Sequence, residues 1–232
     1  MERLDCFEWT RSVPALASDE IHLWFCEFGE LNQHPRAGRQ DAQGYLRAVL
    51  QGYIGSSVAD DDFEIGQHGR PRLPRRPQLG FNLSHTRQAA MVAVAMDLSP
   101  GVDIEIGNRK RPVLDLARRY FCPRETAVLE RLAPEQAQDA FLAIWTAKEA
   151  VLKAIGRGLA FGLDRLEFSL DADGQPVRLE SIAEEGGNVA TWQCMTLRPA
   201  EGFHGCLAWA GSTRRVRTFR VAATRIDGAL RW

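Results

Sequence analysis

The sequence predicts an α+β fold in which antiparallel sheets pack against helices. Two long segments repeat apolar residues at the three- and four-residue spacing of amphipathic helices. Short segments that alternate apolar and polar residues, separated by Gly, Pro or Asp turns, predict strands. Their order is strand, helix, strands, helices, strands. This order favours two α+β halves, residues 1–106 and 107–232, over a parallel sheet of βαβ units.

The first half contains one predicted helix between strands. Residues 21–28 (IHLWFCEF) are rich in β-forming side chains and predict a strand, which a basic loop with Pro and Gly follows. Apolar residues recur at helical spacing from Ala42 to Ile54. We therefore expect a helix that begins near Gln40 or Asp41 and packs one face on a core.

Two apolar segments near residue 100 predict a buried β-hairpin. Residues 89–96 and 101–106 are joined by the short connection LSPG, and the polar stretch 80–86 is expected as a loop before them. Side chains alternate along a strand, so Asp103 and Glu105 project from the same face. Neighbouring carboxylates are tolerated when both are solvated or when a cation lies between them.

The second half begins with helices and ends with strands. Periodicity predicts helices over residues 113–121, from Pro123, and from about Glu135 to Ile155, with a glycine C-cap at Gly156 or Gly158. Beyond them we expect four or five antiparallel strands, over residues 163–171, 175–181, 189–198, 203–211 and 216–225.

The composition excludes several classes of protein. The chain has 232 residues, 45% of them hydrophobic, and a formal net charge of −1, which gives no overall bias toward nucleic acid or membrane. We expect no secretory signal, because its first residues hold no sufficiently long apolar run, and no later run reaches the roughly 20 apolar residues that span a bilayer. The five cysteines are scattered without a CxxC spacing. We therefore expect a cytoplasmic protein without a disulfide framework or a zinc site.

One helical face carries residues suited to chemistry. Trp145, Glu149 and Lys153 recur every four residues and so fall on nearly the same face of the last predicted helix. Such a carboxylate and ammonium, one turn apart, ordinarily form a surface ion pair. Together with Asp103 and Glu105 they would instead offer oxygen ligands and a lysine, which are the components of a magnesium site that handles a pyrophosphate.

Four motifs give the chain a resemblance to a known family. They are HGRP (68–71), FNLSHT (81–86), GVDIE (101–105) and WTAKEAVLKAIGRGL (145–159), in that order. The chain resembles the 4'-phosphopantetheinyl transferases, of the monomeric surfactin-synthetase-activating type, over about residues 40–170. The resemblance implies two similar, pseudo-symmetric α/β halves with coenzyme A bound in the cleft between them.

The implied activity is that of a holo-[acyl-carrier-protein] synthase. Such an enzyme transfers 4'-phosphopantetheine from coenzyme A to a serine hydroxyl of an apo acyl or peptidyl carrier protein and releases 3',5'-ADP. By the resemblance, Asp103, Glu105 and Glu149 bind Mg²⁺, with Mn²⁺ as the alternative ion. Glu149 also matches the general base, and Lys153 the lysine that stabilises the pyrophosphate. Asp103, Glu149 and Lys153 would therefore form the catalytic set.

The resemblance also implies contacts to coenzyme A. Arg70 takes the place of a phosphate-contacting lysine, and Ser84 and His85 match contacts to the 3'-phosphate. Lys148 is either a further phosphate contact or a solvated helix residue. The family carries an arginine near the position of Gln43, and we expect two arginines of the preceding loop to replace it. The full predicted set is Arg36, Arg39, Arg70, Ser84, His85, Lys148 and Lys153.

Two other functions remain compatible with these residues. One is a different Mg²⁺-dependent phosphoryl-transfer enzyme that uses the same acidic cleft. The other is a module that binds carrier proteins without turnover. Basic residues at 72–76, 109–111 and 118–119 could dock an acidic carrier or simply solubilise the surface.

Overall fold

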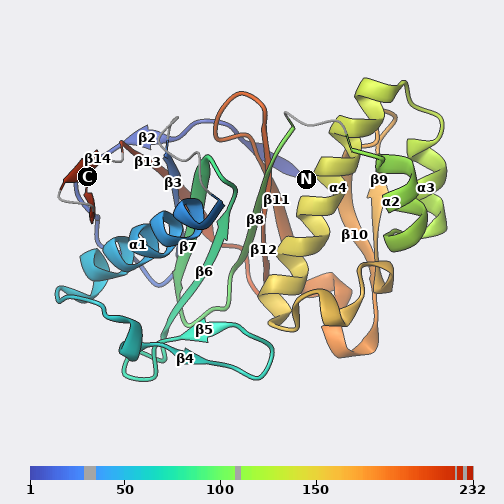
Figure 1. Cartoon of the computed structure of the whole chain (residues 1–232). Helices are drawn as coiled ribbons and strands as arrows, with labels where there is room; N and C mark the ends of the chain where they lie inside the picture. The colour runs from blue at the N-terminus through green and yellow to red at the C-terminus, as the bar shows by residue number, and fades with distance from the viewer. Residues whose placement is uncertain (29–34, 108–110, 223, 227–228, 232) are drawn as a thin grey trace.

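The computed structural model contains four layers, in the order helix, sheet, sheet, helix (Figure 1). It describes residues 1–28, 35–107, 111–222, 224–226 and 229–231. The predicted class, α+β with sheets packed against helices, is confirmed. Within the described residues, no helix combines the length and the apolar character needed to cross a membrane.

The first sheet lies under helix α1 (Pro35–Ile54), as Figure 1 shows. Trp24, Phe81 and Val92 of the sheet bury against Tyr45 and Val49 of this helix. The order of its five strands is β2 (Glu8–Trp9), β13 (Arg215–Ala222), β3 (Glu20–Glu27), β7 (Ala89–Met96) and β6 (Leu79–His85).

The second sheet lies between the first sheet and helix α4 (Pro134–Ile155). Ile21 and Phe25 of the first sheet pack against Val102, Ile104 and Leu207 of the second, so the two sheets share a core. The order of the four strands is β1 (Glu2–Leu4), β11 (Trp192–Leu197), β12 (Phe203–Ala210) and β8 (Gly101–Ile106).

Smaller elements cover the outer side of α4 and the ends of the sheets. Two short helices and one hairpin pack on α4 around Phe121, Phe141 and Phe168. These elements are α2 (Val113–Tyr120), α3 (Pro123–Leu129), β9 (Leu166–Leu170) and β10 (Pro176–Ile182). The remaining strands form two short hairpins, which are β4 (Glu64–Ile65) with β5 (Pro71–Arg72), and β14 (Thr224–Ile226) with β15 (Ala229–Arg231).

The predicted hairpin of residues 89–106 is wrong. Both strands form, but β7 pairs with β3 and β6, whereas β8 pairs with β12 of the other sheet. The chain crosses between the sheets at residues 97–100, so close to β6 that a Cβ on Gly80 would lie 1.7 Å from the Leu98 carbonyl oxygen. The crossing turns Val102 and Ile104 into the core between the sheets and Asp103 toward α4.

Three further expectations need correction. Helix α1 begins at Pro35 rather than near Gln40, because proline suits the first turn of a helix. Residues 80–86 do not form a loop, since residues 79–85 are strand β6. The last predicted strand is not antiparallel, because β13 returns to the first sheet and runs parallel to β3. The strand pairings therefore cross the predicted boundary at residue 106, and the division into halves 1–106 and 107–232 remains a prediction.

His204 of β12 anchors the first half of α4. Its Nδ1 receives a hydrogen bond from the guanidinium of Arg198, which can only donate. The other ring nitrogen, Nε2, therefore carries the proton and lies 3.3 Å from Asp139 Oδ1 of α4. Burial, and then the charge of Arg198, lower the pKa of His204 from 6.5 to about 4.

This histidine predicts acid sensitivity. Between pH 6.5 and 4 the unfolded chain binds a proton at His204 that the folded chain does not, so the free energy of unfolding falls as the pH falls. We expect a contribution of about 1.4 kcal/mol per pH unit, which His204→Gln removes. Urea unfolding at pH 4.5 to 7 measures the slope, and His68→Gln, at an exposed position, is the control. Equal slopes in wild type and His204→Gln would contradict the assignment.

Candidate active site

Glu149 and Lys153 lie on the side of α4 that faces β8. The helix ends at Gly156, whose φ of 81° gives the left-handed C-cap that the sequence predicts. One turn before this cap, the Lys153 Nζ lies 2.7 Å from Asp103 Oδ1 and 3.1 Å from the Val102 carbonyl oxygen. The predicted association of Asp103 with the 145–153 face is therefore present in the structure.

Asp103 is the most constrained carboxylate of this site. Its Oδ1 accepts hydrogen bonds from Lys153 and from Ser84 Oγ, the latter at 2.8 Å. Its Oδ2 is buried and has no hydrogen-bond partner in the described part of the chain. A buried carboxylate oxygen without a donor costs free energy, unless a cation or a donor of a ligand occupies the adjacent space. This oxygen therefore fits a cation.

Glu149 has a pKa well above that of an ordinary glutamate. Burial raises the pKa of its carboxyl to about 7, and the negative charges of Asp103 and Glu105 add to the rise. The ammonium of Lys153 opposes it. A carboxyl with a pKa near the working pH is suited to accept a proton from a substrate.

Glu105 is less closely associated with Asp103 and Lys153 than they are with each other. Its carboxylate forms an ion pair with Arg111 at 2.7 Å, and both side chains are partly exposed. Within the described ranges, no three His, Cys, Asp or Glu side chains are arranged to hold a metal ion. The oxygen donors of Asp103, Glu149 and Glu105 are the type that Mg²⁺ prefers, and Asp103 Oδ2 remains free for it. Magnesium binding by the three carboxylates therefore remains a proposal.

Strand β6 supports the site through polar side chains. Asn82 Oδ1 accepts a hydrogen bond from the Val102 backbone N–H at 2.9 Å, and Ser84 Oγ accepts one from the Ile104 N–H at 3.1 Å. Both side chains are buried and bind β8, where no backbone ladder between β6 and β8 is present among the described pairings. Ser84 is thus engaged with Asp103, while His85 is exposed at the end of β6.

Lys148 is not the solvated helix residue that was one of its two predicted roles, and its buried position does not support the other, a contact to coenzyme A. Its side chain is fully buried, and its Nζ lies 2.7 Å from Glu125 Oε2 and 2.9 Å from the Leu163 carbonyl oxygen. Consecutive residues of a helix are about 100° apart around its axis, so Lys148 lies on a different face of α4 from Glu149. Apolar neighbours one turn away, at Ile144 and Leu152, were the available sequence signal for burial.

The predicted phosphate contact of Arg70 remains a prediction, and its guanidinium is engaged within the protein. Its guanidinium donates to main-chain carbonyls of β6, α4 and the connection before β8. Arg39 lies exposed in α1 rather than in a loop, and the side chain of Arg36 lies outside the described part of the structure. Arg39, His85 and Lys153 thus keep polar groups available to an anion.

Gly101 allows β8 to approach α4. A Cβ at this position would lie 2.0 Å from the Ala150 carbonyl oxygen and 2.4 Å from the Ala154 nitrogen. Both contacts are to helix backbone, which cannot rotate away. The glycine of the GVDIE motif therefore sets the short distance that brings Asp103 to Lys153.

Gly101→Ala is expected to separate β8 from α4. The free energy of unfolding should fall by about 3 kcal/mol, because the added methyl group has no space. The contact between Asp103 and Lys153 should be lost with it. Chemical denaturation measures the first effect, with Gly107→Ala as the control because its Cβ would meet no atom closer than 3.4 Å. Equal stability of the two variants would contradict this explanation.

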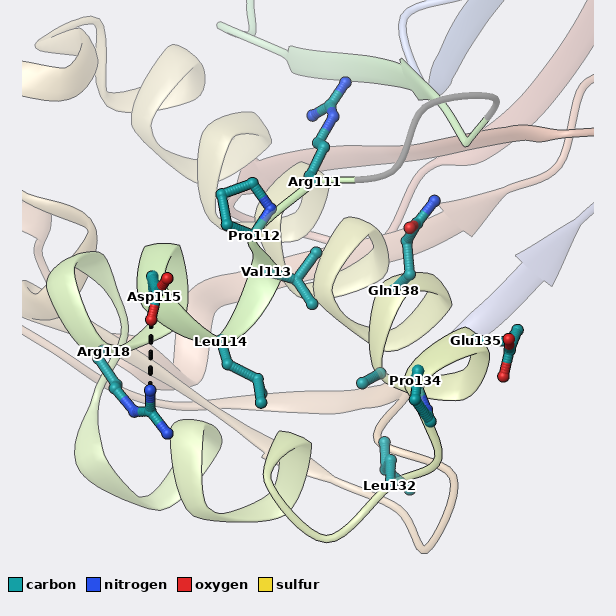
Figure 2. Close-up of a pocket in the computed structure, with 11 residues that line it drawn as sticks. Arg111, Pro112, Val113, Leu114, Asp115, Arg118, Leu132, Pro134, Glu135 and Gln138 are labelled. Carbon is teal, nitrogen blue, oxygen red and sulfur yellow. Dashed lines mark hydrogen bonds and ion pairs between the residues drawn. The ribbon is translucent and has the colours of Figure 1, made fainter.

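Two pockets lie at opposite ends of α4. One, of about 640 Å³, lies between the β4–β5 hairpin and the C-terminal end of α4 and includes His68, Arg76 and Gly156 in its lining. The other, of about 490 Å³, lies between α2 and the first turns of α4 (Figure 2). Figure 2 shows Arg111 at one end of this pocket and the apolar side chains of Leu114 and Leu132 near the other.

Comparison with known proteins gives a consistent result. The family model described as the 4'-phosphopantetheinyl transferase superfamily matches residues 99–194. The chain is 31% identical to the 4'-phosphopantetheinyl transferase HetI of Nostoc sp., over 88% of this chain and 94% of the relative. It is 32% identical to the 4'-phosphopantetheinyl transferase Sfp of Bacillus subtilis, over 56% of this chain and 57% of that protein. The human L-aminoadipate-semialdehyde dehydrogenase-phosphopantetheinyl transferase is 36% identical over 40% of this chain and 32% of its own length.

Proposed function

Because this chain belongs to the 4'-phosphopantetheinyl transferase superfamily, we propose that it transfers the 4'-phosphopantetheine group of coenzyme A to an apo acyl or peptidyl carrier protein. The reaction uses magnesium and releases 3',5'-ADP. The observation that carries this proposal is the contact between Asp103 and Lys153, with an unpartnered oxygen on Asp103, whose negative charge helps to raise the pKa of Glu149. We further propose that the enzyme acts as a cytoplasmic monomer.

The chemistry follows from what the side chains can do. The oxygen of the carrier serine attacks the β-phosphorus of coenzyme A, and the bond from that phosphorus to the departing 3',5'-ADP breaks. Glu149 accepts the proton of the serine hydroxyl, for which a pKa of about 7 is favourable. Lys153, which is partly exposed, neutralises charge on the pyrophosphate and on the leaving group. Asp103 holds its ammonium in place.

Magnesium would be held by Asp103, Glu149 and Glu105. When bound, it supplies positive charge to the phosphate oxygens. Asp103 Oδ2 supports this assignment because it is buried and lacks a donor in the described chain. The commitment of Asp103 Oδ1 to Lys153 and Ser84 fixes which of its two oxygens is available.

The pocket beside the β4–β5 hairpin is our proposed site for the nucleotide end of coenzyme A. Its lining combines basic residues, among them His68 and Arg76, with the apolar side chains of Leu79 and Phe81. It also includes Gly156, three residues after Lys153, so a nucleotide there would place its phosphates near the Lys153 ammonium. Its volume, about 640 Å³, lies within the range of pockets that hold small ligands.

The pocket of Figure 2 is the proposed place for the carrier protein. Arg111 connects this pocket to the site because it also pairs with Glu105. Leu114 and Leu132 add apolar surface, and Arg118 also lines the pocket, where it pairs with Asp115 and Glu130. Arg111 and the apolar side chains would complement an acidic, amphipathic helix of a carrier, although Asp115 and Glu135 also line the pocket.

Release of 3',5'-ADP tests the proposed function against its two alternatives. The protein is mixed with coenzyme A, magnesium and an apo carrier, and the nucleotide product is separated by chromatography. We expect stoichiometric 3',5'-ADP that requires both the carrier and its serine. A carrier-binding module would form a complex without this product, and a different phosphoryl-transfer enzyme would release another nucleotide.

A further inference from the structure

Arg70 connects three elements of the site through one guanidinium group. Its Nη1 donates to the Lys153 carbonyl oxygen, and to that of Ala154 at 3.5 Å, in the last turn of α4. Its Nη2 donates to the Phe81 carbonyl oxygen in β6 at 3.0 Å and to that of Pro100, immediately before β8, at 2.9 Å. These elements carry Lys153, Ser84 and Asp103.

The carbonyls at the end of α4 need such a donor. The last carbonyls of a helix lack intrahelical partners, and the negative end of the helix dipole favours a cation. The backbone N–H of Gly156 donates to Leu152 and Lys153, and it leaves the Ala154 carbonyl oxygen to other donors. Arg70 supplies donors and a positive charge at this end of the helix.

The backbone and the aliphatic part of the Arg70 side chain are held in place as well. Its own carbonyl oxygen accepts a hydrogen bond from Gly66 at 2.9 Å, which closes the turn between β4 and β5. A Cβ at Gly156 would lie 3.6 Å from Arg70 Cδ, so the side chain passes directly along the helix cap. The guanidinium is thus presented by a paired hairpin rather than by a free loop.

We propose that Arg70 is a positioning residue that fixes the last turn of α4 against β6 and β8 and so holds Lys153 at Asp103. The proposal rests on the proposed function, since it assigns Arg70 a part in that reaction. It differs from the phosphate contact that the family resemblance implies. Arg70 lines the proposed nucleotide pocket, but both of its Nη groups are directed to carbonyl oxygens, which a phosphate that bound them would have to displace.

The proposal predicts that a lysine at position 70 cannot replace the arginine. A planar guanidinium reaches acceptors on three elements at once, whereas an ammonium is a compact charge on a flexible stem. A lysine at position 70 would preserve charge for a phosphate but could not maintain this set of carbonyl contacts. Since a misplacement of about 1 Å in a catalytic group can cost about 100-fold in rate, loosening of α4 should appear in kcat.

The test compares Arg70→Lys, Arg70→Gln and a control, Arg47→Gln. Arg47 also joins two elements, with a 2.6 Å ion pair from α1 to Asp60, and it lines neither of the two pockets. Steady-state kinetics give kcat and the KM for coenzyme A. Hydrogen exchange of the amides in residues 151–156 reports on the end of α4 independently of activity.

We expect both Arg70 variants to lose about 100-fold in kcat with little change in KM, and to exchange the amides of residues 151–156 faster than wild type and Arg47→Gln. A lysine variant with wild-type kcat and exchange, beside a glutamine variant with only a raised KM, would overturn the proposal in favour of a phosphate contact. If Arg70→Gln does not fold, the kcat and the hydrogen exchange of Arg70→Lys, compared with those of wild type, are sufficient to test the proposal. If wild type transfers nothing to any carrier, the proposed function fails, while hydrogen exchange still tests the positioning role.

Discussion

Glu149→Gln is expected to abolish transfer to the carrier protein while the protein stays folded. Glutamine has nearly the same shape but cannot accept the serine proton and offers the magnesium ion no charge. We expect a loss of at least about 1,000-fold in kcat/KM, which combines the loss of a general base with the loss of a charged ligand. Steady-state kinetics that follow the formation of the modified carrier measure kcat/KM.

The same substitution should not destabilise the protein. The folded chain holds the Glu149 proton up to about pH 7, whereas an ordinary glutamate releases it near 4.5. The free energy of unfolding therefore falls as the pH rises from 4.5 to 7, and this cost is fully present above pH 7. Glutamine removes it, so at pH 8 the variant should be more stable than wild type by about 1–2 kcal/mol, which allows for partial exposure of the side chain.

Glu130→Gln is the matched control for this prediction. Glu130 pairs with Arg118 at the surface, so its neutralisation should change stability by less than about 1 kcal/mol. It should leave the rate of transfer almost unchanged. A Glu149→Gln variant that transfers at the wild-type rate would remove Glu149 from the chemistry.

Glu125→Gln is expected to have the largest effect on stability. Its carboxylate pairs with the buried Lys148 and accepts hydrogen bonds from the backbone N–H groups of Cys122 at 3.0 Å and Phe168 at 2.9 Å. Glutamine leaves the Lys148 charge buried without its partner. We expect the free energy of unfolding to fall by about 3–5 kcal/mol, as chemical denaturation would measure.

Removing both charges should recover part of this loss. In Glu125→Gln with Lys148→Met no unpaired ammonium remains buried, so the double variant should be more stable than Glu125→Gln alone. Its KM for coenzyme A should equal that of wild type, because neither side chain reaches the cleft. A raised KM in a fully folded Lys148→Met variant would restore Lys148 as a contact to coenzyme A.

Local patterns predicted most of the elements. The residues of α4 from Phe141 to Leu152 follow the helical period, and Gly156 ends the helix as expected. Alternation in β8 correctly separated Asp103 from Val102. The pairing of strands was harder to predict from the sequence. β8 pairs with β12 and β13 pairs with β3, and these pairings join residues about 100 to 200 positions apart. No local signal specifies these partners.

The candidate site was predictable in part for a similar reason. Helix and strand spacing placed Lys153 and Asp103 each on one face of its element, and the family resemblance brought the two faces together. The roles of Ser84 and Arg70 could not be read from residue type, because their polar groups are directed to Asp103 and to main-chain carbonyls far along the chain. Residue type states which hydrogen bonds a side chain can form, and only the fold decides which acceptors it meets.

The intact mass of apo carrier proteins tests the central claim most directly. A panel of apo carriers from fatty-acid, polyketide and nonribosomal-peptide synthesis is incubated with the protein and coenzyme A, with and without magnesium. We expect at least one carrier to gain the mass of one phosphopantetheine group, only with magnesium, and not with Glu149→Gln. A folded wild-type protein that adds this mass to none of the carriers would contradict the proposed function.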